Sequence, residues 1–139
     1  MKIMAIDYGD AHTGIAVSDA LLTLAGFTTV ITAYRPEAVA AEIQRLIAEH
    51  GVTELVLGHP LNMDGTRGPR AEKAEGFAAL LRETTGLPVT LWDERRTTVD
   101  AHNILMAGGK NAKQRKKTVD AAAASLMLEG YLTFKKRQK

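Results

Sequence analysis

Short apolar runs at the start of the chain have the spacing of β-strands. Residues 3–6 and 14–18 form two such runs, and the segment between them begins with turn-forming residues, which predicts a hairpin. Residues 28–34 are rich in Thr, Val and Ile and predict a third strand. The first part of the chain therefore predicts three consecutive strands.

After these strands the apolar period changes to that of a helix. Apolar residues from Val39 to Ile47 recur at intervals of three and four residues, which predicts a helix that begins at Pro36 and ends near Gly51. Three further elements are predicted in the order strand, helix, strand, at residues 54–57, 71–83 and 87–92. A polar loop is expected at residues 61–70.

The last part of the chain predicts two helices on either side of a basic segment. Thr97 and Asp100 resemble a capping box, so a helix is expected to run to about residue 106. Residues 110–117 predict a basic loop, and Thr118 is expected to cap a final helix over residues 119–134. The order of elements predicts an α/β fold, with a mixed sheet flanked by helices, in a single domain over residues 1–139.

Composition excludes several kinds of site. The chain has 139 residues and no cysteine, which excludes a disulfide scaffold, a thiolate metal site and a cysteine nucleophile. No apolar run approaches the roughly 18 residues that span a bilayer, and the amino terminus lacks the pattern of a signal peptide. We therefore expect a cytoplasmic protein with no membrane partner.

The net charge of +2 hides an uneven distribution along the chain. Residues 1–109 hold 9 basic and 14 acidic side chains, whereas residues 110–139 hold 9 basic and 2 acidic ones. A basic block attracts phosphate backbones, but it also occurs as a solvated tail. Charge alone does not decide between these two interpretations.

Three acidic residues lie at the ends of predicted elements that are expected to meet at one edge of the sheet. Asp7 follows the first strand, Glu94 follows the last predicted strand, and Asp120 falls in the first turn of the final predicted helix. Ligands of open α/β sheets gather beyond the strand ends, so these three carboxylates are expected to converge. Magnesium and manganese prefer such oxygen ligands, and two ions ~4 Å apart activate water and stabilise the leaving oxygen in phosphodiester hydrolysis.

Each acid also has a simpler explanation. Asp7 could form a turn before Gly9, and Glu94 could pair with a neighbouring arginine on the surface. Asp120 could complement the positive end of the helix dipole. Asp93 could be a fourth ligand or a solvated carboxylate at the strand end.

Four sequence blocks occur together in a recognisable order. They are Asp7-Tyr8-Gly9 with residues 14–19 (GIAVSD), residues 58–65 (GHPLNMDG), residues 93–98 (DERRTT) and residues 117–124 (KTVDAAAA). With these blocks the chain resembles, over nearly its whole length, the YqgF family of Holliday-junction-resolvase-like proteins, also described as pre-16S ribosomal RNA nucleases. Two departures are Ala11-His12 in place of the usual Lys-Arg, and His59 in place of Leu.

The resemblance implies a fold, a chemistry and a set of catalytic residues. The fold is RNase H-like, with a five-stranded mixed sheet whose first three strands are antiparallel. The chemistry is nucleic-acid cleavage with Mg²⁺ or Mn²⁺. Asp7, Glu94 and Asp120 match the catalytic and metal-binding acids of the family.

Basic and polar residues near these acids are candidates for binding nucleic acid. The candidates are Lys110, Lys113, Arg115, Lys116 and Lys117 before Asp120, Arg95 and Arg96 after Glu94, and Asn62 in the polar loop. The basic segment could instead be solvated, the arginines could pair with nearby acids, and Asn62 could hold its own turn. His59 could replace a phosphate contact or pack beneath the loop.

The leading functional hypothesis is a metal-dependent nuclease that matures the 5′ end of pre-16S ribosomal RNA. One alternative is a Holliday junction resolvase acting on branched DNA, which ordinarily needs a symmetric dimer. Another is a non-catalytic factor that binds nucleic acid or ribosomes. The expected partners are pre-ribosomal RNA or branched DNA and ribosomal particles, and the chain is expected to be a monomer or a homodimer.

Overall fold

The structure is a computed structural model that describes residues 2–22, 25–94 and 112–137, and for residues 112–120 it describes the backbone alone. The strands in this part of the chain are β1 (Lys2–Asp7), β2 (His12–Ser18), β3 (Ala25–Thr32), β4 (Val52–His59) and β5 (Val89–Asp93). The helices are α1 (Pro36–His50), α2 (Pro69–Thr85) and α4 (Ala112–Arg137). No described helix is long and apolar enough to cross a membrane.

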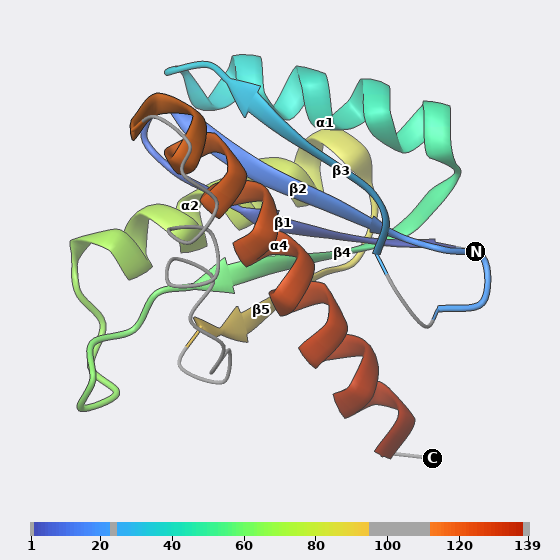
Figure 1. The fold of residues 1–139 in the computed structure, drawn as a ribbon. Helices are drawn as coiled ribbons and strands as arrows, with labels where there is room; N and C mark the ends of the chain where they lie inside the picture. Colours follow the sequence, from blue (N-terminus) through green and yellow to red (C-terminus); the bar gives the residue numbers. More distant parts are fainter. Residues whose placement is uncertain (1, 23–24, 95–111, 138–139) are drawn as a thin grey trace.

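The strands form one mixed sheet in the order β3-β2-β1-β4-β5 (Figure 1). β1, β2 and β3 are antiparallel neighbours, whereas β4 runs parallel to β1 and β5 runs parallel to β4. β1 lies in the middle because its residues 3–6 are apolar on both faces and are buried by helices on each side. The predicted mixed sheet, with its first three strands antiparallel, is confirmed.

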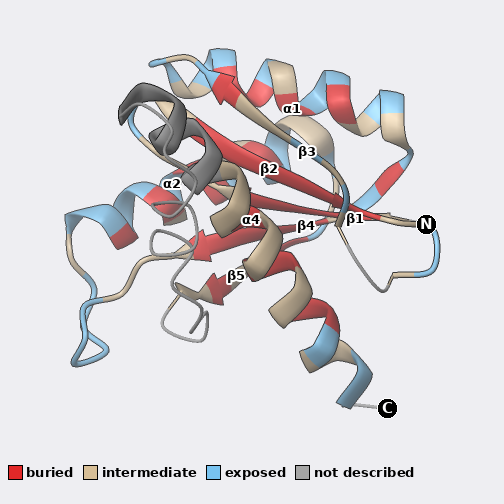
Figure 2. Ribbon diagram, viewed as in Figure 1, coloured by how far each residue is buried: buried red, intermediate tan, exposed pale blue. Residues whose placement is uncertain are grey.

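The helices divide between the two faces of the sheet. Met4 and Ile6 of β1 belong to the apolar cluster formed with α1 and α2, whereas Ile3 and Ala5 belong to the cluster formed with α4. Figure 2 shows the result as mostly buried strands β1, β2 and β4 between helices that bury only their inner sides. Since side chains alternate along a strand, Asp7 continues the series of Ile3 and Ala5 and faces α4.

Two kinds of contact set how α4 crosses the sheet. Toward its carboxyl end, Tyr131 packs edge-on against Trp92 of β5, with ring centroids 5.5 Å apart, and its hydroxyl donates a hydrogen bond to Glu54 of β4. Nearer Asp7, small side chains replace these rings, because Ala5 and Ala16 lie opposite each other and Ala124 of α4 belongs to the same buried cluster. Small side chains allow the helix to approach the sheet closely beside the end of β1.

The basic segment before Asp120 differs from its predicted structure. Residues 112–117 are the first turns of α4 and not a loop, so Thr118 does not cap this helix. Ala, Lys, Gln and Arg all have high helix propensity, and no glycine or proline interrupts them, which outweighs the capping preference of Thr. The other predicted elements are confirmed with ends shifted by a few residues. The helix expected over residues 97–106 lies outside the described residues.

Candidate functional site

Asp7 and Glu94 come together at the edge where the parallel strands end. Trp92 of β5 packs in the cluster on the α4 face, and Glu94, two residues later, lies on that same face. β4 separates β1 from β5, yet the Asp7 and Glu94 carboxyl groups are hydrogen bonded to each other. The predicted convergence of these two acids at one edge of the sheet is therefore present in the structure.

Gly58 of β4 makes this contact possible. A Cβ atom at Gly58 would lie 2.2 Å from Oε1 of Glu94, which is far inside van der Waals contact. The Glu94 side chain therefore lies over the bare backbone of Gly58 and reaches across β4 toward Asp7. No sequence pattern indicates this role of Gly58, and only the structure shows that it makes room for the Glu94 carboxylate.

The Asp7 carboxyl holds its proton more tightly than an ordinary aspartic acid. Burial raises the pKa of Asp7 from 3.8 to about 7, and the charge and hydrogen bond of Glu94 act in the same direction. The charge of Arg70 lowers this pKa and offsets part of the increase. The Asp7 carboxyl therefore retains its proton up to near neutral pH when no cation neutralises it.

Arg70 is a site residue that the sequence does not single out. A pocket of about 270 Å³ opens above the two acids, and it is lined by Asp7, Arg70, Glu94, Ala123 and Met127. Arg70 is exposed in the first turn of α2, and within the described part of the chain its guanidinium makes no hydrogen bond or ion pair. No sequence pattern distinguishes it from an ordinary solvated arginine, because only the packing of α2 brings it beside Asp7.

Asp120 lies on α4, three residues before Ala123 and seven before Met127. These intervals place the three positions along one face of the helix. Its predicted place in the first turn is wrong, because α4 begins eight residues earlier, at Ala112. The helix-dipole explanation of Asp120 is wrong with it, since the dipole acts within the first turn.

The donor set of this pocket suits a hard divalent cation. Two carboxyl groups face each other, and among the described residues neither a cysteine nor a histidine lines the pocket. Magnesium is commonly held by one or two carboxylates, with water and substrate phosphate completing its coordination. Among the described side chains no group of three His, Cys, Asp or Glu residues could hold a metal, so the third acid, Asp120, remains a prediction.

The polar loop after β4 is held by its own side chains. The Asn62 amide donates a hydrogen bond to Oγ1 of Thr66 at 2.9 Å, as expected for a residue that stabilises its turn, and it does not line the pocket. Nε2 of His59 lies 2.7 Å from Oε2 of Glu75 on α2, and Arg67 pairs with the same carboxylate. His59 thus connects the loop to α2 in the described structure.

The structure gives only limited information on the other residues that are predicted to contact nucleic acid. Arg95, Arg96 and Lys110 lie outside the described residues. Four further candidates lie on the first turns of α4, where the backbone alone is described, namely Lys113, Arg115, Lys116 and Lys117. They stay predictions.

The strand order and direction define an RNase H-like fold. A solved structure of this class, T. thermophilus RuvC in complex with a Holliday junction substrate, is similar with a TM-score of 0.65 and 16% identity, over 97% of this chain and 96% of that one. Residues 1–134 match the RuvX family, described as Holliday junction resolvase, and the chain belongs to that family. The resemblance drawn from the sequence motifs is confirmed.

Curated relatives agree with this assignment over the full length of the chain. A protein of Carboxydothermus hydrogenoformans is 43% identical over 99% of both chains. Another from Geobacillus kaustophilus is 44% identical over 98% of this chain and all of its own. Both carry the name "Putative pre-16S rRNA nuclease". The fold and the family are therefore those of nucleases, which hydrolyse phosphodiester bonds.

Proposed function

We propose that this chain is a nuclease dependent on Mg²⁺ or Mn²⁺ that acts in the maturation of the 5′ end of pre-16S ribosomal RNA. The observation that carries the proposal is the contact between the Asp7 and Glu94 carboxyl groups in a pocket that also contains Arg70. The relatives named for pre-16S ribosomal RNA support the choice of substrate.

In this proposal, the acids of the pocket hold a cation and its arginine holds the substrate. Bound Mg²⁺ or Mn²⁺ supplies Lewis acidity and activates water for attack on phosphorus. Asp7 and Glu94 would hold the cation through their carboxylate oxygens, and Asp120 is the proposed third ligand. Arg70 is free to bind the scissile phosphate and offset the negative charge of the acids.

We assign the backbone contacts of the substrate to the cations around this pocket. On a helix, Lys113, Lys116 and Lys117 recur with Asp120 at intervals of three and four residues, whereas Arg115 falls on the other side. The helical structure thus extends the proposed catalytic face of α4 by a row of lysine positions. Arg95, Arg96 and Lys110 are proposed to contribute further contacts to the phosphate backbone.

A second candidate function is the resolution of Holliday junctions. It is favoured by the description of the family and by the likeness of the fold to RuvC. Junction resolution would use the same acids, so the two candidate functions differ in their substrate and not in their catalytic site. A non-catalytic binding factor would need none of the three acids for its function.

Cleavage assays with both substrates test the proposal. The purified chain is incubated with a pre-16S ribosomal RNA fragment and with a four-way DNA junction, in Mg²⁺, in Mn²⁺ and in EDTA. We expect cleavage of the RNA with either cation and none in EDTA. Equal cleavage in EDTA contradicts metal dependence, whereas cleavage of the junction alone supports the second candidate. No cleavage of either substrate supports the binding factor.

The substitution Gly58→Ala is expected to reduce cleavage strongly and stability only slightly. The new methyl group displaces only the flexible end of Glu94, so the free energy of unfolding should fall by no more than about 1 kcal/mol. Cleavage should fall by roughly 10- to 100-fold, because a misplaced catalytic group is costly. Thermal unfolding and cleavage rates measure the two effects, with Gly76→Ala as control, since a Cβ there meets nothing within 4 Å. Unchanged cleavage by Gly58→Ala would argue against a role of Glu94.

A further inference from the structure

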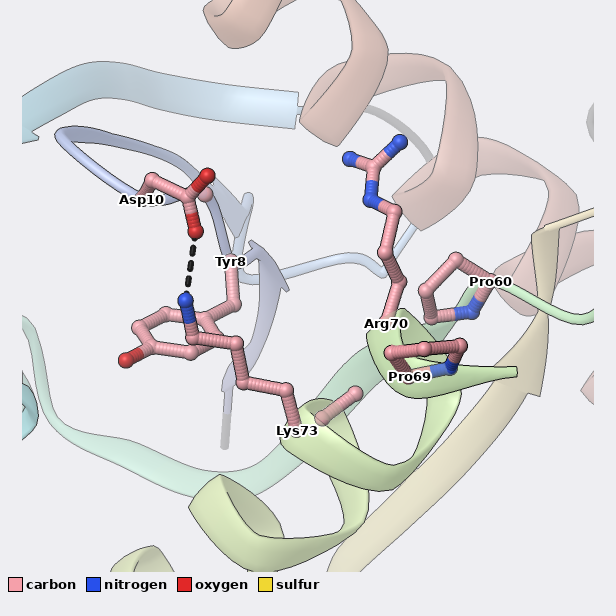
Figure 3. Close-up of a pocket in the computed structure, with 8 residues that line it drawn as sticks. Tyr8, Asp10, Pro60, Pro69, Arg70 and Lys73 are labelled. Atoms are coloured by element: carbon pink, nitrogen blue, oxygen red, sulfur yellow. Dashed lines mark hydrogen bonds and ion pairs between the residues drawn. The ribbon is translucent and has the colours of Figure 1, made fainter. Parts of the chain in front are cut away.

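A second pocket, of about 260 Å³, shares Arg70 with the first, and Figure 3 shows the residues that line this second pocket. Its lining is Tyr8, Gly9, Asp10, Pro60, Pro69, Arg70, Lys73 and Ala74. Tyr8 directly follows Asp7, the last residue of β1, and packs against the apolar cluster on the opposite face of the sheet. The two pockets thus lie on either side of the end of β1, and Arg70 stands between them.

Tyr8 forms a rigid wall of this second pocket. Its ring stacks on Phe77 of α2 with centroids 4.0 Å apart and an angle of 5° between the ring planes. This packing holds the ring in one orientation, while the residue remains only half-buried. An immobilised aromatic ring beside a pocket provides apolar surface for a sugar or a base at little cost in conformational entropy.

Two cations of α2 border the pocket, and within the described part of the chain only Lys73 has an ion-pair partner. Nζ of Lys73 lies 2.5 Å from Oδ1 of Asp10, and Figure 3 shows the lysine reaching across to that carboxylate. An ammonium group has three donors, so this pair leaves donors of Lys73 for a ligand. The Arg70 side chain points away from the pair. The charged lining is therefore net positive, next to the acidic pocket.

The shared arginine indicates what kind of ligand occupies both pockets. A ligand that meets Asp7 and Glu94 through a phosphate, passes Arg70 and continues to Lys73 has anionic groups repeated along a chain. A nucleic-acid strand has this chemistry, with a sugar and a base between successive phosphates. A single small anion could occupy either pocket but would not explain why they adjoin.

We propose that the second pocket is the subsite for the nucleotide next to the scissile phosphodiester. Lys73 and Arg70 bind the phosphate of that nucleotide, and Tyr8 packs against its sugar or base. Asp10 competes with the phosphate for Lys73. The inference rests on the proposed nuclease function, because the acidic pocket defines which phosphate is cut.

Binding of a fluorescein-labelled single-stranded RNA, measured in EDTA, tests the subsite without cleavage. We expect Lys73→Ala to weaken binding by about 3- to 10-fold and to lower the slope of log K against log salt by about 0.7, the value for one phosphate contact. We expect Asp10→Asn to strengthen binding, because it releases Lys73. If the two residues serve only as a structural ion pair, both substitutions act in the same direction, and that result overturns the proposal.

Arg45→Ala is the matched control, because Arg45 is also an exposed cation paired with acids, on α1 and away from both pockets. It should leave binding unchanged, and an effect equal to that of Lys73→Ala overturns the subsite. Cleavage assays with Mg²⁺ separate this inference from the proposed function. RNA binding that depends on Lys73 without any cleavage supports the second pocket as a nucleotide-binding site and contradicts the proposed nuclease function. If the KM and the salt slope of cleavage are the same in Lys73→Ala as in the unsubstituted protein, the subsite is contradicted while the nuclease function stands.

Discussion

Asp7→Asn is expected to reduce phosphodiester cleavage by about a thousandfold or more, which corresponds to roughly 4 kcal/mol of lost transition-state stabilisation. The amide has nearly the shape of the carboxyl group and can still hydrogen bond to Glu94, but it cannot carry the negative charge that a divalent cation requires. Binding of RNA in EDTA should be retained, because the substitution removes no cation. Single-turnover cleavage rates measure the first effect and fluorescence anisotropy measures the second.

Asp93→Asn is the matched control for this substitution. Asp93 is also an acid at the same edge of the sheet, but alternation along β5 directs it to the face opposite Glu94. Cleavage by Asp93→Asn should stay within a fewfold of the unsubstituted protein. Comparable losses in the two variants would mean that general acidity of this edge, and not the pocket above Asp7, governs activity.

The metal-free protein with Asp7→Asn is expected to be more stable than the unsubstituted protein at neutral and alkaline pH. The pKa of Asp7 is about 7 in the folded state and 3.8 without the fold's environment, so folding favours the protonated carboxyl. Stability from this group is present in full below pH 3.8 and is lost as the pH rises through 7. With 1.36 kcal/mol per pKa unit, the loss is about 4 kcal/mol at most, because part of the charge is screened by solvent.

Thermal unfolding in EDTA between pH 4 and pH 9 checks this expectation. The difference between the two proteins removes the contributions of titrating groups that do not interact with Asp7, and it should grow with pH and level off above pH 7. A stability difference of this size corresponds to roughly 10 °C in Tm. Adding Mn²⁺ should stabilise the unsubstituted protein and leave Asp7→Asn unaffected. A difference that does not vary with pH would show that Asp7 is ionised in the metal-free fold.

The elements that sequence predicts well are those in which local pattern and tertiary contacts agree. The helix from Pro36 to His50 has a proline at its start, an apolar stripe toward the sheet and Gly51 in the left-handed conformation at its end, with a φ of 72°. The start of α4 shows the opposite case. Thr118 has the chemistry of a cap, but a run of strong helix formers precedes it, and their summed preference extends the helix by seven residues.

The residues of the site also differ in whether the sequence identifies them. Asp7 and Glu94 are identifiable as candidates because a carboxylate directly after an apolar strand is costly to bury without a partner. Arg70 and Lys73 are not identifiable, since both lie among ordinary polar residues in the first two turns of a helix. Their position beside β1 depends on how α2 packs on the sheet through residues such as Phe77.

By itself the sequence determined the order of strands and helices, the family, and the acids expected at the strand ends, because these depend on local pattern and on motifs that read along the chain. Only the tertiary structure decided which carboxyl groups touch, since that depends on the face of each strand and on the missing side chain of Gly58. It also decided that Arg70 stands between two pockets. Contacts between residues far apart in sequence arise from packing, which no local pattern encodes.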